Sequence, residues 1–213
     1  MSTKERILRE ALNLFSVKGY DAVSLRDIAA AVGIKESSLY NHFKNKQDIF
    51  DSIVAWCLAR ENEFFHDAHL VGDDRVFQAD EASVNMYGNM TEDQFVQTSG
   101  QVFEAVFADE IAVKLRRMLT IEQYRGEKQA ELFRKISFEN SLAFQTQLFQ
   151  AMIGAGFFKK ADPAMMALEF YAPVFLIFYK FDIDAEGVAK AKELFMRHVR
   201  HFSRTYAAQN RPE

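Results

Sequence analysis

The sequence predicts an all-α protein in which a three-helix N-terminal domain precedes a larger helical domain. Apolar residues recur at helical spacing along most of the chain, and no long run alternates as a β-strand would. The 213 residues include only three prolines. Helix starts with the spacing of capping boxes occur at Ser2–Glu5, Ser24–Asp27 and Thr91–Gln94. A chain of this length can hold one or two domains around a substantial core.

The segment 24–43, SLRDIAAAVGIKESSLYNHF, is expected to form two short helices around a turn. Ser24 and Asp27 can cap each other's backbone at the first helix start, and Gly33 can take the positive φ at which that helix stops. The second helix is expected over 36–43. Such a helix-turn-helix places its second helix in the major groove of DNA.

Hydrogen-bonding side chains cover the outer face of this second helix and suit base edges and phosphates. They are Lys35, Ser37, Ser38, Tyr40, Asn41 and His42. Asn45 and Asp48 predict the start of the next helix, whose free amides, with Lys44 and Lys46, suit a phosphate group. An upstream helix, starting at Ser2, is expected to complete a small core under the reading helix.

Taken together, these residues resemble the tetracycline-repressor (TetR) family of bacterial transcription regulators. The matching positions are Phe15, Gly19–Tyr20, Ser24–Ala29, Gly33–Ile34, Ser38–Tyr40, His42–Phe43 and Lys46. The family usually has Ser where this chain has Lys35, so a weaker cap of the reading helix is expected. The resemblance implies a homodimeric repressor that binds a palindromic operator and is released by a small-molecule effector.

The same resemblance assigns roles to individual residues. Tyr40, His42 and Lys46 match phosphate contacts, whereas the polar residues around them match base or mixed contacts. The full set of DNA-binding candidates is Ser24, Arg26, Lys35, Ser37, Ser38, Tyr40, Asn41, His42, Lys44 and Lys46.

The expected division is a helix-turn-helix domain over 1–47 and a helical effector-binding and dimerisation domain over 48–213. Residues 1–50 carry eight Lys and Arg against six Asp and Glu, and the rest carries 18 against 24. The N-terminal segment is therefore slightly basic, whereas the remainder is acidic. A local positive face suffices for operator binding, and an acidic remainder limits non-specific binding to DNA.

The second domain is expected to have an aromatic, adaptable interior, because 18 of the 21 phenylalanines and seven of the eight methionines follow residue 50. Such an interior fits either a packed core or an apolar ligand cavity. The resemblance implies a pocket for an apolar or amphipathic effector. The candidate lining residues are Phe64, Phe103, Phe107, Tyr124, Phe144, Phe170 and Tyr171.

Two segments near the end indicate self-association. Residues 165–179 are apolar on nearly every face, but Glu169 and Pro173 interrupt them and the run is too short for a membrane span. The next helix has apolar residues at near-heptad spacing. Together they suggest a four-helix interface with a second copy, as the resemblance also implies. The interface candidates are Phe175, Phe178, Phe195, Val199 and Phe202.

Other features indicate neither catalysis, nor a metal, nor a cofactor. The pairs His66–His69 and His198–His201 are interpreted as solvated, and Cys57 as a thiol in the core. No Gly-rich phosphate loop or hydrolase triad pattern is present. The start, MSTKER, lacks the apolar stretch of a signal peptide, so a cytoplasmic protein is expected.

Three hypotheses follow from the sequence. The leading one is a ligand-responsive DNA-binding repressor. The second is a DNA-binding regulator or architectural protein without a small ligand, which a fully packed second domain would favour. The third is a helical ligand-binding protein or enzyme whose helix-turn-helix is incidental, and it requires a polar catalytic cluster that the sequence does not display.

Overall fold

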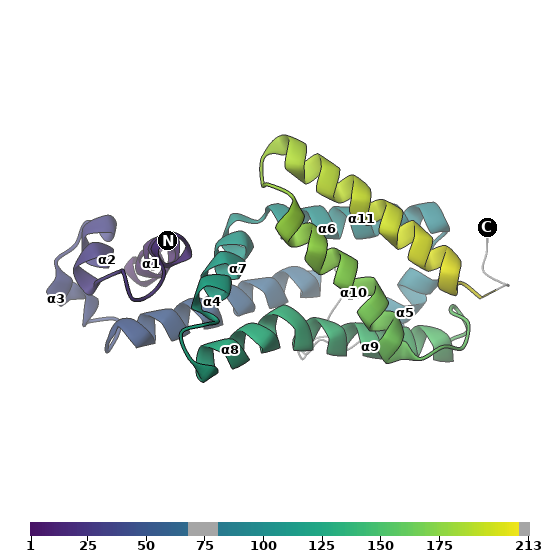
Figure 1. The fold of residues 1–213 in the computed structure, drawn as a ribbon, viewed down its shortest axis with the longest axis horizontal. Helices are drawn as coiled ribbons and strands as arrows, with labels where there is room; N and C mark the ends of the chain where they lie inside the picture. Colours follow the sequence, from purple (N-terminus) through teal and green to yellow (C-terminus); the bar gives the residue numbers. More distant parts are fainter. Residues whose placement is uncertain (68–80, 209–213) are drawn as a thin grey trace. The chain divides into compact units, whose positions relative to one another are not determined.

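A computed structural model describes residues 1–67 and 81–208 (Figure 1). Within these ranges the regular structure is helical, apart from an isolated antiparallel bridge between Phe158 and Ala207, which confirms the all-α prediction. The chain divides into two compact units, a first unit of Met1–Glu61 and Glu110–Ser137 and a second unit of the remainder. Of the histidines singled out in the sequence, His69 lies outside the described residues.

The first unit contains the predicted N-terminal helices and two helices from later in the chain. Its elements are α1 (Thr3–Lys18), α2 (Leu25–Val32), α3 (Glu36–Leu39), the first part of α4 (Lys46–Asp67), α7 (Glu110–Glu122) and α8 (Glu127–Arg134). Apolar side chains at helical spacing are buried along these helices, as the sequence pattern predicts. Side chains that are fully buried there include Ile7, Leu12, Phe15, Ile28, Leu39, Ile49, Phe50, Ile53 and Met118. Cys57 is also buried, as predicted.

The helix α4 contributes residues to both units, since the division falls after Glu61. It carries Trp56, the single tryptophan of the chain. Trp56 is half-buried, and the guanidinium carbon of Arg60, one helical turn later, lies 5.9 Å from its ring centroid. The chain also crosses from the first unit to the second within η1 (Lys135–Glu139), a π-helical turn that joins α8 to the next helix.

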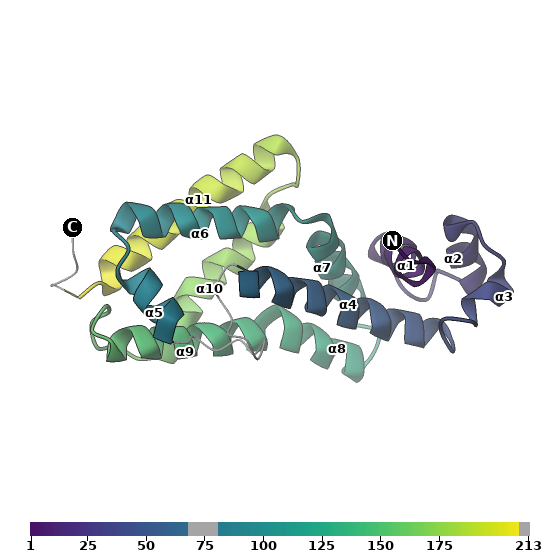
Figure 2. The ribbon, with the colours of Figure 1, turned by 180° about the vertical axis from the view of Figure 1, so that it is seen from behind.

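The second unit contains α5 (Glu81–Gly88), α6 (Glu92–Ala108), α9 (Asn140–Gly154), α10 (Pro163–Lys180) and α11 (Ala185–Tyr206). Figures 1 and 2 show α6 and α11 side by side, and α10 packs against both α9 and α11. The predicted capping box at Thr91 is present, and Asp162 caps the start of α10. No helix among the described residues is both long and apolar enough for a membrane span.

Stacked phenylalanine rings fill the space between α6, α10 and α11. The ring centroid of Phe103 lies 4.3 Å from that of Phe195, 5.3 Å from that of Phe107 and 5.8 Å from that of Phe178. All three neighbouring rings are nearly parallel to it, with interplanar angles of 20° or less. These rings therefore form the apolar core of this part of the second unit.

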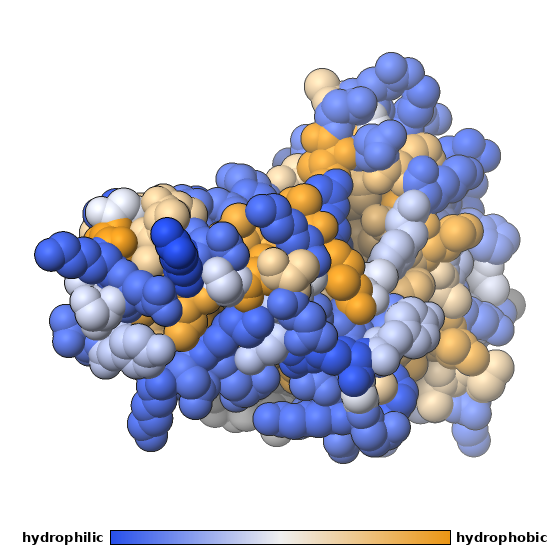
Figure 3. Space-filling view, turned by 60° about the vertical axis from the view of Figure 1, so that its left-hand side comes forward, coloured by the Kyte–Doolittle hydropathy of each residue, from blue (hydrophilic) through white to orange (hydrophobic). Residues whose placement is uncertain are grey.

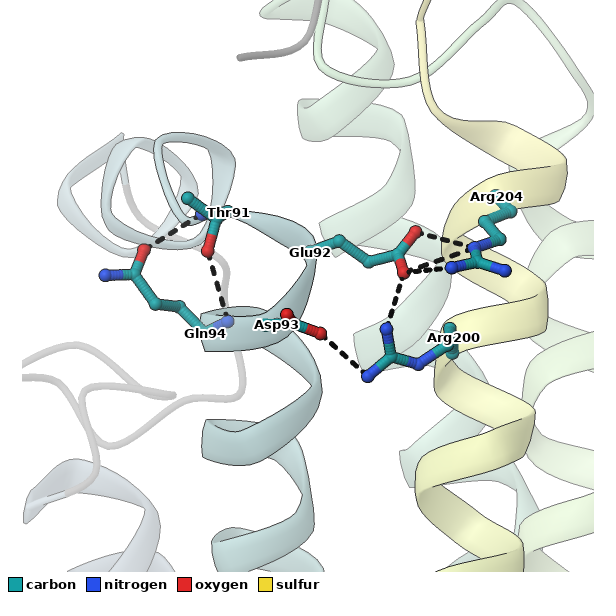
Figure 4. A network of polar contacts seen from close by, with 6 residues as sticks. All are labelled: Thr91, Glu92, Asp93, Gln94, Arg200 and Arg204. Atoms are coloured by element: carbon teal, nitrogen blue, oxygen red, sulfur yellow. Dashed lines mark hydrogen bonds and ion pairs between the residues drawn. The ribbon is translucent and has the colours of Figure 1, made fainter. Parts of the chain in front are cut away.

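Charged side chains join α6 to α11 at the edge of this core (Figure 4). The Glu92 carboxylate accepts hydrogen bonds from Arg204 and, at 2.8 Å, from Nη1 of Arg200. The other terminal nitrogen of Arg200 lies 2.8 Å from Asp93. Hydrogen bonding from Arg204, followed by its positive charge and that of Arg200, lowers the pKa of Glu92 despite partial burial. The network holds the first turn of α6 against α11.

Candidate nucleic-acid interface

The helix-turn-helix begins with the capping box that the sequence predicts. Ser24 Oγ accepts the Asp27 amide at 3.1 Å, and Asp27 Oδ2 accepts the Ser24 amide at 2.8 Å. Gly33 ends α2 in the left-handed conformation with φ of 76°, as expected of a residue without a Cβ. The Ile34 amide then donates to the Ala29 carbonyl at 3.0 Å, which closes the turn.

The reading helix is shorter than the predicted span of 36–43. Only Glu36–Leu39 are α-helical, and the chain continues through a tight turn in which the His42 amide donates to the Leu39 carbonyl at 2.9 Å. Lys35, at the N-cap, provides no side-chain hydrogen bond, so the weaker cap inferred from the sequence is present. Leu39 and Phe43, on either side of this turn, are buried and anchor it to the core.

The segment from Lys35 to His42 presents polar side chains to solvent, and we call it the reading segment. Its exposed side chains include Lys35, Ser37, Tyr40, Asn41 and His42, while Ser38 is half-buried. Tyr40 is 57% exposed, which is high for an aromatic residue and leaves its hydroxyl available to a partner. The chemistry of the surface, with hydroxyl, amide, imidazole and ammonium groups, fits phosphate oxygens and base edges.

Two of the predicted DNA contacts, Ser24 and Lys46, already have hydrogen bonds within the protein. Ser24 Oγ donates its proton to Asp27 Oδ2 at 2.6 Å, so this hydroxyl serves the cap. Lys46 Nζ donates to the carbonyls of Tyr20 and Val23 at 2.8 and 2.9 Å. An ammonium group has three protons, so Lys46 has one donor beyond these two. Arg26 is exposed on the first turn of α2.

The start of α4 has the capping residues that the sequence predicts. Asn45 Oδ1 accepts the Asp48 amide at 2.9 Å, and the Asp48 carboxylate accepts the amide of Lys44 at 2.8 Å. The side chain of Lys44 is exposed beside this helix start. A lysine at a helix N-terminus adds positive charge to the free amides of the first turn, which favours an anionic group there.

Two residues of α7 and its following turn contact this domain without any local signal in the sequence. Glu122 Oε1 accepts the Tyr20 amide at 2.7 Å, and the Arg125 guanidinium lies 3.9 Å from the Tyr20 ring centroid. Both residues are more than one hundred positions from Tyr20, so only the tertiary structure reveals the contact.

The predicted effector-pocket residues do not gather around one cavity in the described structure. Phe103 and Phe107 are buried in the stacked core, whereas Tyr124 is 88% exposed in the first unit. Phe64, Phe144, Phe170 and Tyr171 are half-buried. An open surface pocket of about 640 Å³ lies between α6 and the start of α11, and none of the seven predicted residues lines it.

The predicted interface residues of α11 lie inside one copy of the chain. Phe195, Val199 and Phe202 are buried against the same chain's other helices, because the apolar stripe of α11 faces α6 and α10. Phe175 and Phe178 of α10 are half-buried.

The histidine pair of α11 also differs from its interpretation as solvated. His198 is half-buried, and its Nε2 lies 2.8 Å from the Phe170 carbonyl, while His201 is exposed. Burial lowers the pKa of His198. Among the described residues, no group of three or more metal-ligating side chains occurs.

Comparison with known proteins agrees with the N-terminal arrangement. The family described as "Bacterial regulatory proteins, tetR family" matches residues 7–53. The biofilm operon negative regulator IcaR of Staphylococcus aureus is 48% identical over 54 residues, which are 25% of this chain and 29% of IcaR. The chain thus matches under a third of the length of this curated relative, through the N-terminal segment.

Solved structures extend the likeness in fold to nearly the whole chain. A TetR-family regulator from Mesorhizobium loti aligns with a TM-score of 0.70 at 20% identity and covers 97% of both chains. SmeT, the repressor of a Stenotrophomonas maltophilia multidrug efflux pump, aligns with a TM-score of 0.65 at 20% identity, over 100% of this chain and 94% of its own. The N-terminal segment 7–53 thus matches the tetR family of bacterial regulatory proteins, and the fold is similar to that of such regulators over nearly the whole chain.

Proposed function

We propose that this protein is a cytoplasmic transcriptional repressor that binds a specific DNA duplex through its reading segment. The observation that carries the proposal is the exposed polar surface from Lys35 to His42, anchored from below by the buried Leu39 and Phe43. This anchoring matters because contacts to base edges distinguish one base pair from another only if their donors and acceptors are held in place. The likeness to IcaR, a negative transcriptional regulator, supports repression.

The distribution of charge between the two units supports the same function. The first unit carries 16 Lys and Arg against 12 Asp and Glu, a net charge of +4, whereas the second carries 10 against 18, a net charge of −8. DNA attracts the basic unit and repels the acidic one, so electrostatics favours binding through the first unit. For function we keep the division into a DNA-binding domain over 1–47 and a regulatory domain over 48–213.

We further propose that the repressor is a homodimer associated through α10. Four large apolar side chains of this helix, Met165, Leu168, Leu176 and Tyr179, are 48–60% exposed in one copy. Figure 3 shows that apolar side chains reach the surface among hydrophilic ones on the face that it draws. Half-buried Phe175 lies on the same helix. A twofold dimer would present two reading segments to a pseudo-palindromic site, about 34–36 Å apart for successive major grooves.

Substitution of Leu176 tests the dimer. Leu176→Glu should yield a monomer in sedimentation equilibrium, because two copies would each bury a carboxylate in an apolar contact. Ile121→Glu is the matched control, since Ile121 is 45% exposed in the first unit and should leave the mass unchanged. A Leu176→Glu protein that remains dimeric at micromolar concentration contradicts the α10 interface.

The remaining proposal concerns an effector of apolar or amphipathic chemistry, contacted by the half-buried aromatics Phe64, Phe144, Phe170 and Tyr171 of the second unit. The stacked packing of Phe103 and Phe107 favours the second hypothesis, a regulator without a small ligand. A thermal-shift screen with such compounds decides between them, because a ligand that binds only the folded state raises Tm. Release of bound operator by the same compound would establish the ligand-responsive repressor.

Selection of genomic fragments by the purified protein, at about 0.15 M salt to reduce non-specific binding, tests DNA recognition. Enrichment of one palindromic site is the expected result, and sequence-independent enrichment would support the architectural alternative. Tyr40→Ala should weaken binding to the selected duplex, whereas Tyr124→Ala, an exposed tyrosine outside the reading segment, should not. Equal affinities of these two variants would show that the reading surface is misassigned.

A further inference from the structure

Tyr20, in the turn between α1 and α2, is held by three charged residues from two other helices and their flanks. Lys46 begins α4, Glu122 ends α7, and Arg125 follows α7. We call these four residues the Tyr20 clamp. All of them belong to the first unit, and Glu122 and Arg125 lie outside the segment 7–53 that matches the family.

Each clamp residue bonds or packs against the same short turn. Glu122 Oε1 accepts the Tyr20 amide at 2.7 Å, while Lys46 Nζ donates to the Tyr20 carbonyl at 2.8 Å. Lys46 Nζ also lies 4.1 Å from the Tyr20 ring centroid, and the guanidinium carbon of Arg125 lies 3.9 Å from it. A cation this close to an aromatic ring is attracted by the negative face of the ring. These contacts therefore hold both the backbone and the ring of Tyr20 in place.

Burial makes the two α7-side residues depend on each other. Glu122 is 4% exposed, and its Oε2 lies 2.9 Å from Nε of Arg125. Since a buried carboxylate without a cationic partner is strongly unfavourable, loss of Arg125 would force Glu122 to move or to lose its hold on Tyr20. Gly19 permits this contact, because a Cβ there would lie 3.2 Å from the Ile121 side chain and 3.4 Å from Glu122.

The turn that the clamp holds leads directly into the helix-turn-helix. The Val23 carbonyl accepts a hydrogen bond from Lys46, and Val23 immediately precedes Ser24, the N-cap of α2. α2 packs on α3, which begins the reading segment. A displacement of the turn would therefore change the start of α2 and, through it, the placement of α3.

We infer that Glu122 and Arg125 are positioning residues for DNA recognition, which hold the turn at Tyr20 so that the reading segment fits its operator. The inference rests on the proposed DNA-binding function and extends the determinants of affinity to a part of the chain outside the helix-turn-helix. Through these two residues, the segment 110–137 would influence the placement of the reading segment.

Operator affinity and its salt dependence test the inference. Arg125→Met keeps much of the side-chain length but removes the charge, and we expect it to weaken binding to the selected duplex about tenfold, which corresponds to about 1.4 kcal/mol. Because a positioning residue touches no phosphate, the slope of log affinity against log salt should stay unchanged. A residue in direct phosphate contact would reduce that slope by about one, and this result would overturn the inference.

Two further variants make the comparison specific. Arg125→Lys keeps the positive charge without the planar guanidinium, so we expect an affinity between those of the unaltered protein and Arg125→Met. Arg117→Met removes an exposed charge from α7, the helix that precedes Arg125, and we expect no change in affinity. A loss in Arg117→Met equal to that in Arg125→Met would show a general effect of charge and contradict positioning.

Hydrogen exchange decides the inference independently of DNA. In the protein without DNA, the amides of 19–24 and of the reading segment should exchange faster in Arg125→Met than in Arg117→Met, because the clamp protects the turn. Unchanged exchange in 19–24 would overturn the inference. If the unaltered protein retains no duplex at all, the proposed function fails, whereas exchange still shows whether the clamp positions the turn.

Discussion

Replacing Phe103 with Ala tests whether the aromatic interior of the second unit is packed core or the lining of a ligand site. Phe103 is 4% exposed and stacks on three other phenylalanine rings. Removing such a ring costs about 3–5 kcal/mol, through lost burial and the cavity that remains. For a chain of this size each kcal/mol lowers Tm by about 2–4 °C, so a fall on the order of 10 °C is expected.

The assay is thermal unfolding followed by far-ultraviolet circular dichroism, with no ligand added. Tyr124→Ala is the control, because the sequence assigned Tyr124 to the same pocket and the structure exposes 88% of it. We expect this variant to stay within about 0.5 kcal/mol of the unaltered protein. A loss of less than about 1 kcal/mol in Phe103→Ala would refute the packed core, since a ring lining an empty cavity has fewer contacts to lose.

Two further predictions concern α6 and α11. Because arginine contacts lower the pKa of Glu92 in the folded state, its ion pairs stabilise the protein fully above the ordinary value of 4.5 and lose that effect as pH falls through the lowered pKa. Glu92→Gln should lower the free energy of unfolding by about 0.2–1 kcal/mol at pH 7 and weaken its dependence on acid pH, as measured by urea titration. An unchanged dependence on acid pH would contradict the role of these ion pairs. Gly187→Ala should lower Tm strongly, because the added Cβ would lie 2.1 Å from the Asp182 carbonyl oxygen. Gly154→Ala, with no neighbouring atom within 4 Å of its added Cβ, is the control and should be neutral or slightly stabilising, so equal Tm losses in the two variants would contradict the steric argument.

Local features of the fold were predictable because their causes are local. The caps at Ser24, Thr91 and Asp162 depend on residues within three positions of each other, and the structure contains all three. The end of α3 was not predictable to the residue. Its last turn changes from α-helical to tighter bonding between Leu39 and His42, and both patterns place Leu39 and Phe43 inward.

The candidate sites show where local reasoning stops. Lys46 has the sequence position of a phosphate contact, yet the structure directs its ammonium group to two carbonyls and a ring of the preceding turn. The sequence assigned residues of both α10 and α11 to the dimer interface. Only the tertiary packing shows that Phe195 and Val199 are covered by the same chain while Leu176 remains exposed. Such differences depend on contacts between distant segments, which spacing does not encode.

The position of Trp56 has a practical consequence for spectroscopy. Since the chain has one tryptophan, its fluorescence comes from a single site on α4, the helix that contributes to both units. The indole is half-buried, and a guanidinium carbon lies 5.9 Å from its ring centroid. A small rotation of the helix would therefore alter the polarity of the indole's surroundings and the quenching of its fluorescence. The intrinsic emission of the unlabelled protein therefore offers an optical signal for any rearrangement of α4 during titration with DNA or with small molecules.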